Sequence, residues 1–94
     1  MKYGEAQEMC VSGAPIARRG WKGKGMFVYH VPAAVYPAMT DAAKKYIGLE
    51  VQYNAYLAIR AVGGSVSPWV PSINDCLADD WEIAMQDWSR SYED

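Results

Sequence analysis

Apolar side chains near the start of the chain recur every three or four residues, which is the spacing of one helix face. The pattern runs from Tyr3 to Cys10, and Ser12-Gly13 followed by a proline supplies a stop signal. We therefore predict a short amphipathic helix over residues 3–12.

A different pattern, typical of β-strands, follows this helix. Residues 16–19 alternate apolar and basic side chains, and residues 26–31 are rich in β-branched and aromatic side chains. A glycine-punctuated segment at 20–25 separates the two. This arrangement predicts a β-hairpin.

A second hairpin is predicted in the middle of the chain. Residues 53–62 are apolar enough for a central strand, and Gly63-Gly64 offers a tight turn into a strand over residues 66–70. Pro68 cannot donate a hydrogen bond to a neighbouring strand, so this last strand is predicted at the sheet edge.

The connections are predicted to be loops and short helices. Pro32 and Pro37 bound a loop, and Thr40 or Asp41 could then cap a brief helix that ends at Gly48.

Near the end of the chain, Ser72 and Asp75 have the spacing of a capping box, which predicts one helical turn over residues 73–77. Trp81, Ile83 and Met85 then alternate on one face of a final strand.

Together these elements predict an α+β fold: a small antiparallel β-sheet with the N-terminal helix packed on one face and short helical turns in the connections. The 94 residues suffice for one domain, with a core over residues 1–86 and a polar tail over residues 87–94. Four tryptophans and seven tyrosines exceed what one thin core covers, so we expect a homo-oligomer.

Composition narrows the class of protein. Half of the chain is apolar (51%) and a fifth is charged (21%), as in a folded globular protein. The net charge of −2 gives no general attraction to nucleic acid or anionic lipid.

No apolar run approaches the ~20 residues that cross a bilayer, and no secretory signal is recognisable, so we expect a cytosolic protein. Cys10 and Cys76 match no disulfide or zinc pattern and are predicted to be reduced and buried.

The sequence lacks the residue patterns of common catalytic and metal sites. His30 is the sole histidine and is expected to be an ordinary strand residue. One histidine with two isolated cysteines provides no transition-metal site, and we expect no cofactor. Met26-Phe27 stands where a phosphate-binding P-loop requires lysine and serine or threonine. We therefore expect no catalysis.

An acidic cluster leaves one alternative open. Asp75, Asp79, Asp80 and Glu82 could hold Mg²⁺ or act as paired carboxylates, although such runs around a turn more often cap helices or face solvent.

Two segments carry chemistry suited to a nucleotide-like ligand. Residues 18–26 place a tryptophan among four cations and three glycines, which suits stacking on a base and donation to phosphates. Residues 69–75 add a second tryptophan, a rigid proline and polar side chains for a ribose or base edge. The same residues also fit a purely structural interpretation, in which the tryptophans pack in the core, the lysines face solvent, and Ser72 and Asp75 cap a helix. The ligand-binding and the structural interpretations both stay open.

The combined motifs resemble a known phage family. They comprise Gly20-Trp21-Lys22-Gly23-Lys24-Gly25-Met26, Tyr53-Asn54-Ala55-Tyr56, Trp69-Val70-Pro71-Ser72, Asn74-Asp75-Cys76-Leu77-Ala78 and Asp80-Trp81. The chain is similar to the second type of phage Thoeris anti-defence protein from Gly4 to about Ile83.

The resemblance implies a phage-encoded sponge that acts in the cytoplasm of the infected bacterium. It implies a homotetramer whose subunit interfaces enclose a cyclic ADP-ribose signal, glycocyclic ADP-ribose, made by a host TIR-domain enzyme. Sequestering that signal without degrading it would keep the defence effector inactive. Which isomer is preferred, and whether a second class of ligand such as a cyclic oligonucleotide binds, does not follow from the sequence.

The resemblance also implies the ligand-binding residues. Trp21 and Met26 would lie against the base, Lys22 and Lys24 near phosphate, Asn74 and Asp75 at ribose or base edges, and Trp69 would shape the wall. The family loop more often has asparagine where this chain has Lys22. The alternatives are a single-stranded nucleic-acid binder, which the acidic charge disfavours, a phage protein-interaction module, and an enzyme that hydrolyses the signal.

Overall fold

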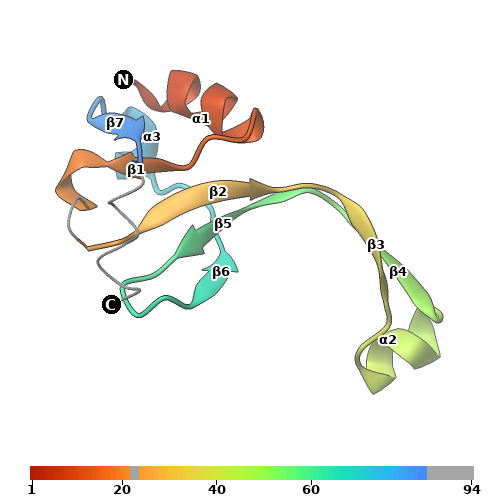
Figure 1. Cartoon of the computed structure of the whole chain (residues 1–94). Helices are drawn as coiled ribbons and strands as arrows, with labels where there is room; N and C mark the ends of the chain where they lie inside the picture. Colours follow the sequence, from red (N-terminus) through yellow and green to blue (C-terminus); the bar gives the residue numbers. More distant parts are fainter. Residues whose placement is uncertain (22–23, 85–94) are drawn as a thin grey trace.

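A five-stranded antiparallel sheet forms the body of the molecule in this computed structural model, which describes residues 1–21 and 24–84 (Figure 1). Within those residues the strand order is β6-β5-β2-β1-β7. The strands are β1 (Ile16–Arg18), β2 (Phe27–Val31), β5 (Tyr56–Arg60), β6 (Val66–Pro68) and β7 (Trp81–Ile83). This sheet, with the helices beside it, confirms the predicted α+β fold.

Helix α1 (Tyr3–Val11) lies over the sheet, packed against β1, β2 and β7 (Figure 1). Its bounds differ by one residue from the predicted helix. Ala6 and Cys10, one turn apart on the same helix face, are fully buried in this contact. The spacing of apolar residues therefore predicted the helix and two residues of its buried face, whereas Met9 of the same pattern is exposed.

The core lies between α1 and the sheet. Ala6, Cys10, Ile16, Val28 and Trp81 form its buried cluster, and Ile16 and Val28 are directly paired across β1 and β2. The Cys10 thiol points at the Val28 carbonyl oxygen, with 3.8 Å between sulfur and oxygen, and burial raises the thiol pKa. Cys10 is therefore the buried, free cysteine that the sequence predicted.

The prediction that Cys76 is buried was wrong, because this cysteine is exposed. It lies on α3 (Ile73–Leu77), a five-residue helix with no buried residue. Because so short a helix packs few of its side chains against the rest of the protein, the Cys76 thiol is left on the solvent side.

The first hairpin is present but differently paired. β1 meets β2 through the Ile16–Val28 pair, whereas three consecutive pairs join β1 to β7. β1 ends at Arg18, and a 3₁₀ turn, η1 (Arg19–Trp21), follows it. The predicted last strand is confirmed as β7, although Met85 and the predicted tail lie outside the described residues.

The chain between β2 and β5 forms an arm that the sequence did not predict. β3 (Ala34–Pro37) and β4 (Glu50–Tyr53) pair as a two-stranded antiparallel sheet, with α2 (Asp41–Tyr46) at its tip (Figure 1). The predicted loop between Pro32 and Pro37 is thus a strand, and Pro37 is tolerated because it ends that strand.

The predicted central strand over residues 53–62 was wrong in its extent. β4 ends at Tyr53 and belongs to the arm, and β5 begins at Tyr56 and belongs to the main sheet. The short helix in the arm is confirmed as α2, where the Ala43 N–H donates to the Thr40 side chain at 3.1 Å. Gly48 follows α2 with φ +145°, which favours glycine.

Replacing Ile16 with alanine tests the core. The Ile16→Ala variant should lose about 2–5 kcal/mol of unfolding free energy because it leaves a cavity between α1 and the sheet. Urea denaturation at a fixed protein concentration measures the loss. The exposed Val66→Ala variant on β6 is the control and should stay within about 0.5 kcal/mol of wild type. Equal losses in both variants would contradict this core.

Candidate ligand-binding site

Trp81 is the centre of an aromatic cluster that also contains Tyr3, Trp21 and Trp69. It is 1% exposed, and the other three rings surround it. The Trp81 ring lies 5.4 Å from Trp21 at 81° and 6.0 Å from Trp69 at 75°, both in edge-to-face geometry. Tyr3 packs at 5.4 Å from Trp81. Such geometry aligns the positive edge of one ring with the negative face of another and favours one arrangement over others.

The cluster draws on four separate segments of the chain. Tyr3 begins α1, Trp21 ends η1, Trp81 begins β7, and Trp69 directly follows β6. The main chain of Trp69 is fixed as well, because its N–H donates to the Leu57 carbonyl at 2.8 Å. Trp21 at the end of η1 and Trp69 after β6 are thus both placed against Trp81.

Helix α3 begins beside this cluster with a full capping box. The Asp75 N–H donates to the Ser72 hydroxyl at 3.0 Å, and the Ser72 N–H donates to the Asp75 carboxylate at 3.0 Å. Both bonds satisfy N–H groups that the first turn of a helix leaves without partners. The predicted cap is confirmed, with aspartate in the position where glutamate is more usual.

Two residues of the main sheet, Arg18 and Trp81, also form hydrogen bonds with Asp75. Arg18 Nη1 donates to Asp75 Oδ1 at 3.3 Å, and Arg18 Nε donates to Asp80 Oδ1 at 3.0 Å. The Trp81 indole N–H donates to the Asp75 carbonyl oxygen at 2.8 Å. Arg18 and Trp81 are directly paired across β1 and β7, so one cross-strand pair holds both the side chain and the main chain of Asp75.

The hydrogen bond to Asp80, followed by that carboxylate's charge, raises the pKa of the Arg18 guanidinium. Burial works in the opposite direction, and the Asp75 carboxylate adds to the rise.

The structure brings together three of the predicted site residues: Trp21, Trp69 and Asp75 all contact Trp81. Lys24 and Asn74 are exposed, and no hydrogen bond or ion pair within the described part of the chain joins either side chain to the cluster. The Lys24 N–H donates to the Trp21 carbonyl at 3.0 Å.

The two remaining predicted residues are Met26 and Lys22. Met26 is half-buried directly before β2, and Lys22 lies outside the described residues.

Sequence reasoning missed the roles of Arg18 and Trp81. A signal was present for Arg18, because it shares a strand face with buried Ile16, two residues earlier. A cation on a core-facing position needs a carboxylate nearby, and Asp75 and Asp80 were the available acids. For Trp81, alternation indicated a strand but not which side chains it would meet.

The acidic cluster is divided between arginines. Asp75 and Asp80 bind Arg18, Glu82 lies 3.8 Å from Arg19, and Asp79 is exposed. Over residues 1–21 and 24–84, no three acidic, histidine or cysteine side chains are grouped to hold a metal ion. His30 lies in β2, as expected of a strand residue. None of the described helices is long and apolar enough to cross a membrane.

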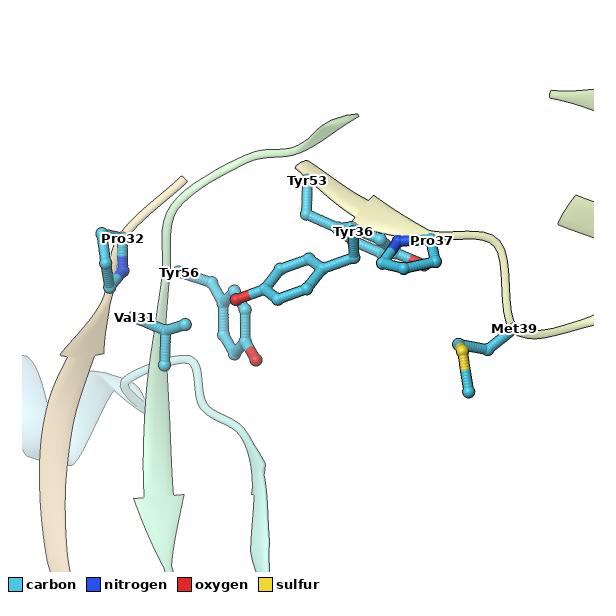
Figure 2. Close-up of a pocket in the computed structure, with 7 residues that line it drawn as sticks. All are labelled: Val31, Pro32, Tyr36, Pro37, Met39, Tyr53 and Tyr56. Atoms are coloured by element: carbon cyan, nitrogen blue, oxygen red, sulfur yellow. The ribbon is translucent and has the colours of Figure 1, made fainter. Parts of the chain in front are cut away.

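A separate hollow of about 360 Å³ lies where the arm leaves the main sheet (Figure 2). Figure 2 shows the Tyr36 side chain extending from β3 toward the side where Val31 and Tyr56 lie. None of its seven lining residues carries a charge: Val31, Pro32, Tyr36, Pro37, Met39, Tyr53 and Tyr56. This surface suits apolar contact and offers no cation to a phosphate.

The fold and the aromatic cluster define a class first: small α+β proteins whose antiparallel sheet is covered by one helix and gathers loop tryptophans at one end. A family model described as the Thoeris anti-defense 2-like domain matches residues 1–84. A protein named Thoeris anti-defense 2, from Bacillus phage SP01, is 33% identical over 84 residues, covering 88% of this chain and 93% of the relative. The chain belongs to the Thoeris anti-defense 2-like family, which confirms the resemblance seen in the sequence motifs.

Removing the Ser72 hydroxyl tests how α3 is held. Ser72→Ala should cost about 1 kcal/mol, as the loss of an N-cap usually does. Hydrogen exchange of the amides at residues 73–77 should become faster, because the first turn loses its cap. Ser67→Ala on β6 is a control, since this exposed serine caps no helix. Unchanged exchange in Ser72→Ala would show that the capping box does not stabilise α3.

Proposed function

We propose that this chain is a phage anti-defence sponge that binds a cyclic ADP-ribose-type signal, glycocyclic ADP-ribose, made by host TIR-domain proteins. It would hold the signal intact in the cytoplasm of the infected bacterium and so keep the Thoeris effector inactive. The observation that carries the proposal is the convergence of Trp21, Trp69 and Asp75 on Trp81, in a chain of the Thoeris anti-defense 2-like family. Trp21 and Trp69, from the two segments that we propose as walls of one site, each pack against Trp81.

The chemistry of this end of the molecule suits a nucleotide-like ligand. Trp21 and Trp69 are half-buried, so each indole packs on Trp81 and still leaves surface for a ligand. Lys24 is exposed next to Trp21 and can reach a phosphate. Asn74 is exposed on α3, where its amide can both donate to and accept from a ribose or base edge. Met26 and Lys22 are proposed to complete the site.

Binding without turnover is supported by how the nearby carboxylates are used. Acid–base catalysis needs a group that can exchange protons with the ligand. Asp75 and Asp80 are engaged by Arg18 and Glu82 lies 3.8 Å from Arg19, which leaves Asp79 as the exposed carboxylate of the cluster. A protein that stores one ligand per site must instead bind tightly, and nanomolar affinity corresponds to about −12 kcal/mol. Stacking contributes about 1–3 kcal/mol per base, and bonds to phosphate add to it.

We also propose that the chain assembles as a homotetramer with ligand sites at subunit interfaces. The arm supports this proposal, because an isolated two-stranded hairpin is marginally stable in water. Its exposed apolar side chains include Met39 and Leu49, each 82% exposed. Together with the uncharged hollow at the base of the arm, they form an apolar surface of the kind that protein interfaces cover.

Ligand capture tests the sponge. Purified protein is incubated with the cyclic product of a TIR-domain enzyme, freed of unbound ligand by filtration, denatured by heat, and the released material is identified by mass spectrometry. We expect intact signal in proportion to protein. Trp21→Ala should weaken binding by at least about tenfold, since it removes a stacking surface. Tyr29→Ala, which removes a half-buried ring that contacts Phe27, is the matched control and should bind as wild type does.

Each other outcome has a distinct meaning. Chemically altered product would identify an enzyme. No captured ligand would favour a nucleic-acid or protein-binding module, and unchanged affinity in Trp21→Ala would remove Trp21 from the site. Circular dichroism of each variant confirms that it is folded.

A charge on the arm tests the assembly. Leu49→Glu should shift the protein from tetramer toward smaller species, because a carboxylate would be buried at the interface. Light scattering coupled to size-exclusion chromatography measures the mass. Val62→Glu, an exposed apolar position in the turn between β5 and β6, is the control. A tetramer in both variants would exclude Leu49 from the interface, and a monomeric wild type would overturn the proposed assembly.

A further inference from the structure

Arg18 joins the two segments of the proposed site. It is the last residue of β1 and directly precedes η1, which carries Trp21. Its guanidinium reaches Asp75, the third residue of α3. The start of η1 and α3 are therefore tied to each other through one side chain, and both elements also contact Trp81.

Arg18 also offsets two carboxylates at this end of the molecule. Its guanidinium faces two carboxylates, on Asp75 and Asp80, and the three side chains are 29%, 15% and 27% exposed. Such partial burial weakens the screening that water would provide. With Arg18 in place the three groups sum to one negative charge; without it they sum to two, beside a surface that must accept phosphates.

We propose that Arg18 is a positioning residue of the ligand site, which fixes α3 against β1 and offsets the carboxylates that would otherwise repel an anionic ligand. This inference rests on the proposed function for the identity of the ligand. Arg18 itself need not touch the ligand: its donors Nε and Nη1 point at Asp80 and Asp75.

Substitutions at Arg18 separate the tether from the charge. Arg18→Met keeps much of the side-chain volume and loses the charge, whereas Arg18→Lys keeps the charge and loses the planar fork that reaches two carboxylates at once. Asp80→Asn in the Arg18→Met background returns the local sum to one negative charge. Arg60→Met, which removes an arginine from β5 over the Phe27 ring, controls for net charge.

The first measurement needs no ligand. In the free protein, amide hydrogen exchange over residues 72–77 should be faster in Arg18→Met than in wild type, intermediate in Arg18→Lys and unchanged in Arg60→Met. If these amides exchange in Arg18→Met at the same rate as in wild type, the inference is overturned whether or not the proposed ligand binds. Failure of the wild type to bind the cyclic ADP-ribose signal would overturn the proposed function instead.

The second measurement is calorimetry with the intact cyclic ADP-ribose signal. Arg18→Met should weaken binding at least about tenfold, which is the effect of about 1.4 kcal/mol. Asp80→Asn should restore a large part of the loss in the double variant, and lower ionic strength should widen the gap between Arg18→Met and wild type. A merely structural role would not be rescued by removing a second charge. Wild-type affinity in Arg18→Met, or no rescue by Asp80→Asn, would overturn the inference.

Discussion

The burial of Trp81 is the constraint on which the arrangement of this molecule depends. Its main chain pairs β7 with β1, its N–H donates to the Met1 carbonyl, and its indole N–H donates to the Asp75 carbonyl. Its ring is also the common neighbour of three aromatic side chains from other segments. A large apolar ring with one donor can be buried only where that donor finds an acceptor, and α3 supplies it. Core packing and the relative position of two surface segments thus have the same cause.

The candidate site is consequently continuous with the hydrophobic core. In many proteins, ligand residues lie on loops that a separate core merely supports. Here Trp21 and Trp69 are packed against the core cluster, and the tryptophan-core and ligand-contact interpretations that the sequence left open are compatible. In the proposed sponge the same rings would serve both purposes, so ligand occupancy would be thermodynamically linked to folding stability.

Local signals in the sequence predicted the elements whose formation depends on near neighbours. The apolar spacing from Tyr3 to Cys10 identified α1, and Ser72 with Asp75 identified the start of α3, because helices and their caps are settled within a few residues. The family motifs selected Trp21 and Trp69, and each of these rings packs against Trp81. What the sequence did not predict depends on distant pairing. Residues 53–62 were predicted as one strand, but Tyr53 pairs with β3 as the end of β4, and residues 56–60 pair with β2 as β5.

The same limit explains the errors at single residues. Arg18 was grouped with the cations of residues 18–26 because its place on a predicted strand indicates the need for a carboxylate but not which one. The pairing of β1 with β7 brings Asp75 and Asp80 near. Cys76 resembled a buried cysteine because that residue type usually is one, and the shortness of α3 decided otherwise.

The contrast between the two cysteines has a practical consequence. Cys10 is enclosed under α1, whereas the Cys76 thiol is exposed next to Asp75, at the edge of the proposed site. A thiol-reactive fluorophore would therefore attach to one position in the native chain without any engineered cysteine. Its emission would report events at α3 in real time, so that the arrival and departure of a ligand could be followed as rates.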